Sequence, residues 1–93
     1  MAEVEFAPRA QADLVRLKLW FAELDDEVAA RAVTAILAGI DRLAVSPFIA
    51  PQLPNSNSRE LQIRFGRYGY VARYGVRGDR VIVARIFHGR EKR

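Results

Sequence analysis

Apolar and polar residues alternate over residues 3–7, where Val4 and Phe6 fall on one side of an extended chain and glutamates on the other. This period of two predicts a short strand. Pro8 suits the first turn of a helix, and apolar residues then recur at three- and four-residue steps. The recurring residues are Ala10, Leu14, Leu17, Phe21 and Leu24. They form one apolar stripe, which predicts an amphipathic helix that ends near residue 23.

A second amphipathic helix is predicted after a short joint. Asp25 and Asp26 interrupt the first stripe and supply a capping oxygen and negative charge, both typical of a helix start. The same spacing then returns in Ala29, Val33, Ile36, Ile40 and Leu43. Ser46 and Pro47 end the helix. Because the joint is so short, we expect the two helices to form an antiparallel hairpin.

The rest of the chain is predicted to be a loop followed by a sheet. Residues 46–58 contain three prolines and no regular period, which indicates a long loop. Runs of strand-forming residues then cover residues 59–65, 68–76 and 80–88, separated by glycine-containing turns. These runs predict an antiparallel meander with the helical hairpin on one face. Residues 1–93 are therefore expected to form one α+β domain of the order strand, helix, helix, strand, strand, strand.

Composition removes several classes of chemistry. The chain has no cysteine, which excludes disulfides, thiolate nucleophiles and cysteine-ligated metal sites. It has one histidine and no glycine-rich phosphate loop, so we expect no metal, no cofactor and no Ser/His/Asp catalysis. The N-terminus is acidic where a signal peptide is basic, and no apolar run approaches the ~18 residues of a membrane span. A cytoplasmic protein without membrane contact is expected.

Charge is divided unevenly along the chain. Residues 1–58 contain five Lys/Arg and eight Asp/Glu, whereas residues 59–93 contain ten Lys/Arg and three Asp/Glu. The two parts therefore carry net charges of −3 and +7. Basic residues gathered on one structural layer attract phosphate chains or acidic protein segments. The sheet is thus the predicted binding surface.

Arginines within the predicted strands and residues at the chain end are the candidates for this binding. A guanidinium group binds phosphate or carboxylate with two parallel hydrogen bonds, and it is costly inside a strand unless it is paired or faces solvent. The predicted target- or anion-binding residues are Arg64, Arg73, Arg85, His88 and Arg90. Ion pairs with Glu60 and Asp79, or plain solvation, are the alternative that the residues leave open.

The register of the last two strands decides whether Arg73 and Arg85 share a face. With a two-residue turn at Gly78 and Asp79, Arg73 lies opposite Ala84, and Arg85 points to the other face. One extra loop residue would bring the two arginines together. The sequence leaves both registers open.

His88 and Trp20 have two possible roles each. His88 has the only side chain whose ordinary pKa is near neutrality, so it could move a proton in phosphodiester cleavage, or it could be structural. If the protein is a nuclease, His88, Arg85 and Arg73 are the candidate catalytic residues. Trp20 lies beside the first apolar stripe, where it could edge the core or belong to a partner-binding patch.

Several motifs follow one another along nearly the whole chain. They are Phe6-Ala7-Pro8-Arg9-Ala10, Arg59-Glu60-Leu61, Phe65-Gly66-Arg67-Tyr68-Gly69-Tyr70-Val71 and Ile86-Phe87-His88-Gly89-Arg90-Glu91. Their order, with a proline-containing loop between the helices and the last three strands, resembles the RelE/ParE superfamily of bacterial type II toxins.

The resemblance implies a small toxin that a cognate antitoxin neutralises. The C-terminal segment of the antitoxin would wrap the toxin, and its N-terminal part would bind operator DNA, so the toxin would reach operator DNA only through the antitoxin. An acidic antitoxin tail would find a basic sheet and helical grooves here and would fold as it binds. The expected antitoxin-binding residues are Trp20, Arg73 and Arg85.

Within the superfamily, RelE-like members resemble ribosome-dependent ribonucleases that cut mRNA, whereas ParE-like members poison DNA gyrase. The cutting members tend to carry lysines before the second strand, an arginine directly after a strand tyrosine, and a tyrosine beside the terminal histidine position. Here residues 46–58 contain no cation, and Tyr68 and His88 are each followed by glycine. The resemblance therefore favours a ParE-like, plasmid-stabilisation-type toxin that inhibits gyrase. A ribosome-dependent mRNA endonuclease and a non-toxic partner- or nucleic-acid-binding member of the fold are the alternatives.

Overall fold

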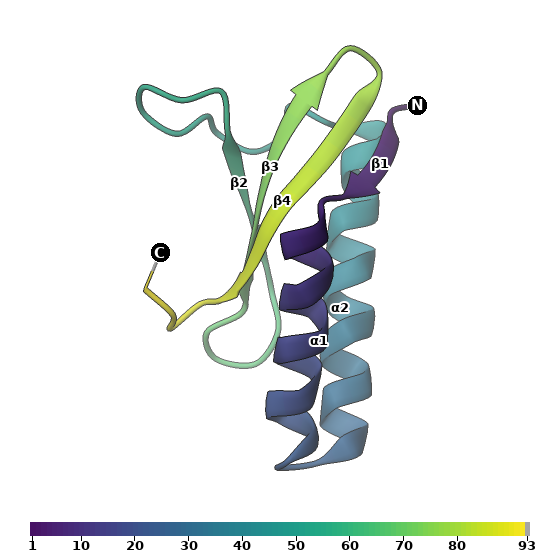
Figure 1. Ribbon diagram of the computed structural model, residues 1–93, viewed down its shortest axis with the longest axis vertical. Helices are drawn as coiled ribbons and strands as arrows, with labels where there is room; N and C mark the ends of the chain where they lie inside the picture. Colours follow the sequence, from purple (N-terminus) through teal and green to yellow (C-terminus); the bar gives the residue numbers. More distant parts are fainter. Residues whose placement is uncertain (93) are drawn as a thin grey trace.

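The computed structural model describes residues 1–92 and has the predicted α+β order. The chain forms a short strand, a helical hairpin and then three strands (Figure 1). The elements are β1 (Glu3–Phe6), α1 (Pro8–Ala22), α2 (Asp26–Val45), β2 (Arg59–Ile63), β3 (Tyr70–Arg77) and β4 (Arg80–His88). Within this described part, no helix combines the length and the apolar character that a bilayer span requires.

The two helices bury the predicted stripes. α1 starts with Pro8 as its first residue, and α2 is capped by Asp25, whose carboxylate accepts hydrogen bonds from the backbone N–H groups of Glu27 and Val28 at 2.8 and 3.1 Å. Ala10, Leu17, Ile36, Ile40 and Leu43 are all buried. The last residue of the first stripe, Leu24, is 77% exposed, because α1 ends at Ala22 and the chain turns before the stripe can continue.

β1 completes a four-stranded mixed sheet, in the order β1-β4-β3-β2. It pairs in parallel with the start of β4, Glu3 opposite Arg80 and Phe6 opposite Val83. The other two pairings are antiparallel, as the predicted meander requires. The helices cover one face of the sheet, and the core between them contains the largest buried side chains, among them Tyr70, Tyr74, Ile86, Val81 and Val83.

The connection between β2 and β3 is longer than the predicted two-residue turn. β2 ends at Ile63 and β3 begins at Tyr70, so residues 64–69 form a loop. Gly69 has a φ of +64°, and a Cβ there would lie 2.5 Å from the carbonyl oxygen of Ile63. The loop therefore closes against the end of β2 in a way that only glycine permits.

A β-bulge, and not the turn, sets the register between β3 and β4. The turn at Gly78 and Asp79 has two residues, since Arg77 pairs with Arg80. Further along, Tyr74 pairs with Val83, whereas Arg73 pairs with Arg85, so Ala84 is the extra residue. The prediction that a two-residue turn places Arg73 opposite Ala84 was wrong, because the bulge shifts the register by one residue and brings the arginines together.

The proline-containing segment before β2 is tied to the sheet. The Tyr74 hydroxyl donates to the carbonyl oxygen of Pro47 at 2.8 Å, and the Arg59 guanidinium donates to that of Ala50 at 2.7 Å. Gln52 also bridges to Arg59. The predicted loop is therefore anchored at several points.

Candidate functional site

Arg73 and Arg85 lie side by side on the face of the sheet that points away from the helices. Both guanidinium groups lie over the ring of Phe87, at 5.4 and 4.6 Å from its centre. The alternation of side chains along β4 places Phe87 and Arg85 on this outer face and Ile86 and His88 on the inner face.

Each of these two arginines is already paired with a carboxylate. The Arg73 guanidinium donates twice to Glu60, at 3.0 and 2.8 Å. Arg85 donates twice to Asp13 of α1, at 2.8 and 3.2 Å. Pairing with Glu60 was one of the alternatives left open by the sequence, whereas Asp79 forms no ion pair with any described residue. An incoming anion would therefore have to compete with a carboxylate at either guanidinium group.

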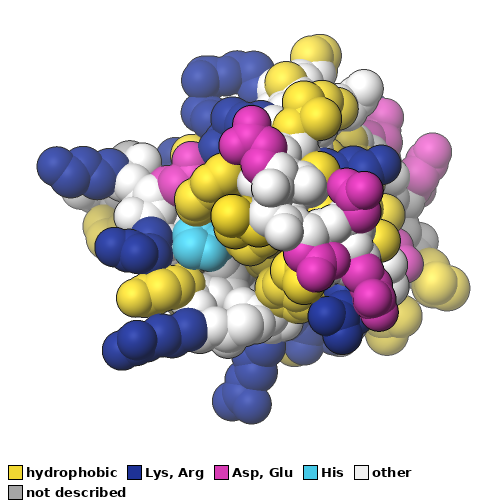
Figure 2. Space-filling view, turned by 90° about the horizontal axis from the view of Figure 1, so that it is seen from below, with side chains coloured by type: hydrophobic (Ala, Val, Ile, Leu, Met, Phe, Trp, Pro, Cys, Tyr) yellow, Lys and Arg dark blue, Asp and Glu magenta, His cyan; other side chains and the backbone are white. Residues whose placement is uncertain are grey.

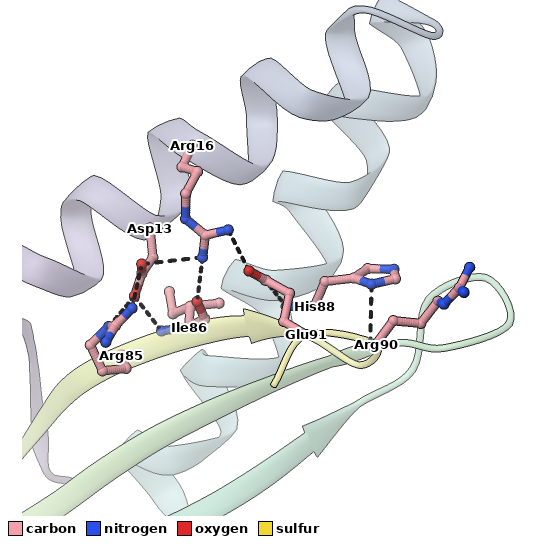
Figure 3. A network of polar contacts seen from close by, with 7 residues as sticks. All are labelled: Asp13, Arg16, Arg85, Ile86, His88, Arg90 and Glu91. Carbon is pink, nitrogen blue, oxygen red and sulfur yellow. Dashed lines mark hydrogen bonds and ion pairs between the residues drawn. The ribbon is translucent and has the colours of Figure 1, made fainter. Parts of the chain in front are cut away.

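Asp13 is the centre of this polar network (Figure 3). It is 4% exposed, and it also accepts hydrogen bonds from the backbone N–H of Ile86 at 2.8 Å and from Arg16 at 3.3 Å. Burial alone would raise the pKa of the Asp13 carboxyl, but the hydrogen bonds from Arg85, Ile86 and Arg16 outweigh it and lower the pKa. Asp13 thereby joins α1 to the part of β4 that β1 does not cover. Nothing in the sequence marked it, because its partners on β4, Arg85 and Ile86, lie more than seventy residues away.

His88 lies on the inner face among aromatic rings and is 8% exposed. Its ring centre is 5.1 Å from that of Trp20 and 5.5 Å from that of Tyr70. The Nδ1 atom accepts a hydrogen bond from the backbone N–H of Arg90 at 3.3 Å. Burial lowers the pKa of His88, Glu91 opposes this shift and Arg90 adds to it, so the neutral form of the ring is favoured.

Tyr70, which contacts His88, carries a buried hydroxyl without a hydrogen-bond partner among the residues that the structure describes. Burial raises the pKa of Tyr70 to about 12, and Glu91 adds to this effect. The side chain is 1% exposed. An unpaired buried hydroxyl destabilises the fold, and it is the kind of group that a bound partner or a water molecule can satisfy.

Three arginines, Arg64, Arg67 and Arg90, lie at the end of the sheet, around the loop of residues 64–69. Arg64, Arg67 and Arg90 are exposed, and within residues 1–92 none of them forms an ion pair. The ring of Tyr68 is 47% exposed, and the guanidinium groups of Arg67 and Arg90 lie 5.6 and 5.0 Å from its centre. We call Arg64, Arg67, Tyr68 and Arg90 the loop-end cluster.

Figure 2 shows this end of the molecule with the single histidine beside basic side chains, while acidic side chains gather at the tip of the helical hairpin. Trp20 reaches this end from α1 and is 45% exposed, so it both edges the core against His88 and presents a surface. The sequence analysis missed Arg67 and Tyr68. A basic residue next to an aromatic one in a turn between strands was the available signal.

The predicted site residues therefore divide into two groups. Arg73 and Arg85 lie together on the outer face, in ion pairs. Arg64 and Arg90 lie at the sheet end, with His88 and Trp20 nearby on the inner side. Among the described residues, no group of three or more His, Cys, Asp or Glu could hold a metal ion.

Comparison with known proteins gives the family. The model described as "ParE toxin of type II toxin-antitoxin system, parDE" matches residues 4–93. The chain belongs to this ParE toxin family. It is thus the toxin of a type II toxin–antitoxin system, and a cognate antitoxin is implied as its partner.

Relatives and a solved structure agree with this family. The toxin is 39% identical to "Toxin RelE3" of Caulobacter vibrioides over 93 residues, the full length of both chains. It is 39% identical to "Toxin RelE1" of the same organism over 85 residues, which are 91% of this chain and 90% of the relative. The solved structure "Chromosomal ParDE TA system from P. aeruginosa" shares the fold, with a TM-score of 0.80 and 22% identity over 95% of this chain and 96% of that one.

Proposed function

We propose that this ParE-family toxin inhibits DNA gyrase by binding it, without cutting RNA. The sequence resembles ParE-like members of the superfamily, which poison gyrase. One observation carries the proposal: the sheet separates the residues that a nuclease would have to bring together. His88 is on the inner face, whereas Arg73 and Arg85 are on the outer face over Phe87.

Cleavage of a phosphodiester requires a proton carrier and cations that converge on one phosphate. Here both outer arginines are held by carboxylates, with N–O distances of 2.8 Å in each ion pair. Burial also lowers the pKa of His88, which disfavours the charged imidazolium that would give a proton to a leaving oxygen. This arrangement is consistent with a protein that binds its target without catalysing a reaction on it.

The loop-end cluster is the proposed target-binding surface. It offers guanidinium groups that form no ion pair with any residue from 1 to 92, and an exposed tyrosine whose ring two of them contact. Arginine and tyrosine are the residues most often found at the energetic centre of protein interfaces. Trp20 is exposed at the same end and extends the surface.

The test is a gyrase supercoiling assay with purified toxin. We expect the toxin to inhibit supercoiling. We expect Arg67→Glu together with Arg90→Glu to raise the toxin concentration for half inhibition by roughly tenfold or more, because both substitutions reverse a charge of the proposed binding surface. The matched control, Arg9→Glu with Arg31→Glu, changes the net charge equally at exposed positions on the helices. It should change the toxin concentration for half inhibition by less than about twofold. Unchanged supercoiling and no gyrase-dependent DNA breaks would reject the proposal.

Ribosome-dependent mRNA cleavage is the second candidate. Both curated relatives at 39% identity carry RelE names, and His88, Tyr70 and the backbone of Arg90 are neighbours at the same end of the sheet. Primer extension after induction would then show cuts at fixed codon positions that disappear in His88→Ala. Normal mRNA ends in arrested cells exclude this candidate.

A further inference from the structure

A cavity of about 450 Å³ opens between the start of β2 and the end of β3. Its walls are the segment before β2 and the last three residues of β3, residues 75–77. This volume lies in the range of small-molecule sites, about 300–1,000 Å³. Figure 1 shows the segment before β2 and the β3–β4 turn at the opposite end of the sheet from the loop of residues 64–69. The cavity shares no residue with the loop-end cluster.

Gly75 lines this cavity, and neither the backbone nor the packing requires a glycine there. Its φ lies outside the left-handed region, and a Cβ added to it would meet no atom within 4 Å. Every other glycine of the chain has either a positive φ or a Cβ position closer than 3 Å to a neighbouring atom. A glycine inside a strand weakens the strand, and it often marks a place where a ligand approaches the backbone closely. Gly75 therefore indicates a binding site.

Two guanidinium groups line the cavity without a carboxylate partner. Arg59 donates from Nη1 to the carbonyl oxygens of Ala50 and Phe48, at 2.7 and 3.5 Å, which leaves its other two nitrogens without an acceptor among the described residues. Arg77 is exposed, and neither arginine forms an ion pair within residues 1–92. The described lining of the cavity contains no carboxylate. This arrangement favours a ligand with a phosphate group, which guanidinium groups bind through parallel hydrogen bonds.

The wall beside these cations suits the base of a nucleotide. The ring of Phe48 is 64% exposed, and the Arg59 guanidinium lies 5.1 Å from its centre. Exposed aromatic rings beside basic side chains are the surfaces on which bases stack in proteins that bind single strands. Asn57 lines the same cavity, and its exposed amide can both donate to and accept from the polar edge of a base.

The segment that carries this wall is held in place before a ligand binds. The backbone N–H of Leu53 donates to the carbonyl oxygen of Ser58 at 2.8 Å. The side-chain amide of Gln52 donates to the carbonyl oxygen of Ser56, also at 2.8 Å. A preformed wall spares the ligand the cost of ordering a loop.

We propose that this cavity binds one nucleotide unit, with the phosphate on Arg59 and Arg77 and the base against Phe48. Gly75 leaves room for the ligand beside β3. The unit can be a free nucleotide or one residue of a single-stranded nucleic acid, because both carry the same phosphate and base. This inference goes beyond the inhibition of gyrase and does not depend on it, since it uses no residue of the loop-end cluster.

An NMR titration of the full toxin with AMP tests the site. We expect saturable shifts of the amide resonances of residues 57–59 and 75–77, and unchanged resonances in residues 64–69. Inorganic phosphate and adenosine each supply only part of the contacts, so each should bind at least about fivefold more weakly than AMP. Absence of saturable shifts at residues 75–77 overturns the proposal. An affinity for inorganic phosphate equal to that for AMP also overturns it, because the base would then contribute nothing.

Filling the cavity tests its location. Gly75→Leu places a side chain in open space without backbone strain, so the variant should unfold at or above the wild-type temperature. It should bind AMP at least about fivefold more weakly, the loss expected when a base can no longer stack. The matched control is Ala30→Leu, which adds bulk at an exposed position of α2 and should leave the affinity unchanged. Wild-type affinity in Gly75→Leu overturns the proposal.

Charge reversal tests the phosphate contact and does not depend on how Gly75→Leu folds. Arg77→Glu should weaken AMP binding by at least about fivefold, because an attractive contact becomes repulsive. Arg31→Glu changes the net charge equally at an exposed position of α2 and should change the affinity by less than about twofold. Equal affinities of these two variants overturn the proposal.

Competition with a short single-stranded oligothymidylate distinguishes the two sources of the nucleotide. Displacement of AMP from residues 75–77 by the oligonucleotide supports a nucleic-acid strand as the ligand, whereas AMP binding that the oligonucleotide does not displace supports a free nucleotide. The gyrase proposal is tested separately, because Arg67→Glu with Arg90→Glu should bind AMP within about twofold of the wild type. Failure of the toxin to inhibit gyrase therefore leaves the nucleotide site standing.

Discussion

Replacement of Asp13 by alanine is the most direct test of how α1 is held on the sheet. The carboxylate accepts hydrogen bonds from Arg85, Arg16 and the backbone of Ile86, and its side chain is 6% exposed. Asp13→Ala removes both carboxylate oxygens, and with them all of these hydrogen bonds. Within residues 1–92, one other polar side chain joins α1 to the part of β4 that β1 does not pair with. It is Arg16, which donates to the Ile86 carbonyl at 3.4 Å.

The expected loss of unfolding free energy depends on which of the donors can be hydrated once the carboxylate is gone. The N–H of Ile86 would stay buried without an acceptor, which costs about 1–3 kcal/mol. The side chains of Arg85 and Arg16 are 25% and 43% exposed, so water can replace much of what they lose, and we count about 1 kcal/mol for the two ion pairs together. The total is about 2–4 kcal/mol, or a fall in Tm of roughly 10–25 °C for a domain of this size.

Urea unfolding at pH 7 measures this loss. Asp13→Asn is the matched variant, since its amide oxygen can still accept from Ile86, and it should lose about half as much. Asp41→Ala removes an exposed acid from α2 and should stay within about 0.5 kcal/mol of the wild type. A loss of less than about 1 kcal/mol in Asp13→Ala would show that the network does not hold α1 in place.

The same variants predict a dependence on pH. The pKa of Asp13 is lower in the folded protein than in the unfolded chain, so its contribution is complete above the unfolded value of about 3.9 and disappears as the pH falls through the folded value. The difference in unfolding free energy between the wild type and Asp13→Asn should therefore shrink below about pH 4. A difference that is constant from pH 7 to pH 3 would contradict the lowered pKa.

Two further predictions concern the histidine and the loop before β3. An NMR titration of the single histidine should give a pKa below about 6.5, and the stability of the wild type should fall as the pH drops through 6.5, because the unfolded chain takes up the proton first; a value above 6.5 would contradict burial as the dominant cause. Gly69→Ala should destabilise the protein by at least about 1 kcal/mol more than Gly78→Ala in urea unfolding, since both residues have positive φ but only Gly69 would meet a carbonyl oxygen. Equal losses would show that the close approach to Ile63 is relieved at no cost.

The elements of this fold could be predicted from local patterns. The apolar stripe of α2 and its Asp25 cap predicted a helix at 26–45 to within a residue or two, and β4 was predicted with its observed bounds. Helix periodicity and capping depend on neighbours within four residues, so the sequence states them directly. The ends of β2 and β3 were missed, because the loop of residues 64–69 depends on contacts of Gly69 with a different strand.

The candidate site could be predicted only in part. The concentration of cations in the last third of the chain made Arg64 and Arg90 candidate binding residues; both are exposed, but Arg64 lies in the loop after β2 and not, as predicted from the apolar alternation, within the strand. The same reasoning gave no reason to expect that Arg85 would be paired with Asp13, since the two are separated by 72 positions. Composition tells how many charges a chain has, whereas only packing tells which of them already have partners.

By itself, the sequence determined the helices, the strands, the order in which they occur and the excess of positive charge after residue 58, since each of these is a property of neighbouring residues or of composition. The tertiary structure alone decided the parallel pairing of β1, the bulge at Ala84 and the aromatic surroundings of His88. The physical reason is that a one-residue change in strand register moves a side chain to the opposite face. That single shift placed Arg73 beside Arg85 and left His88 on the other side of the sheet.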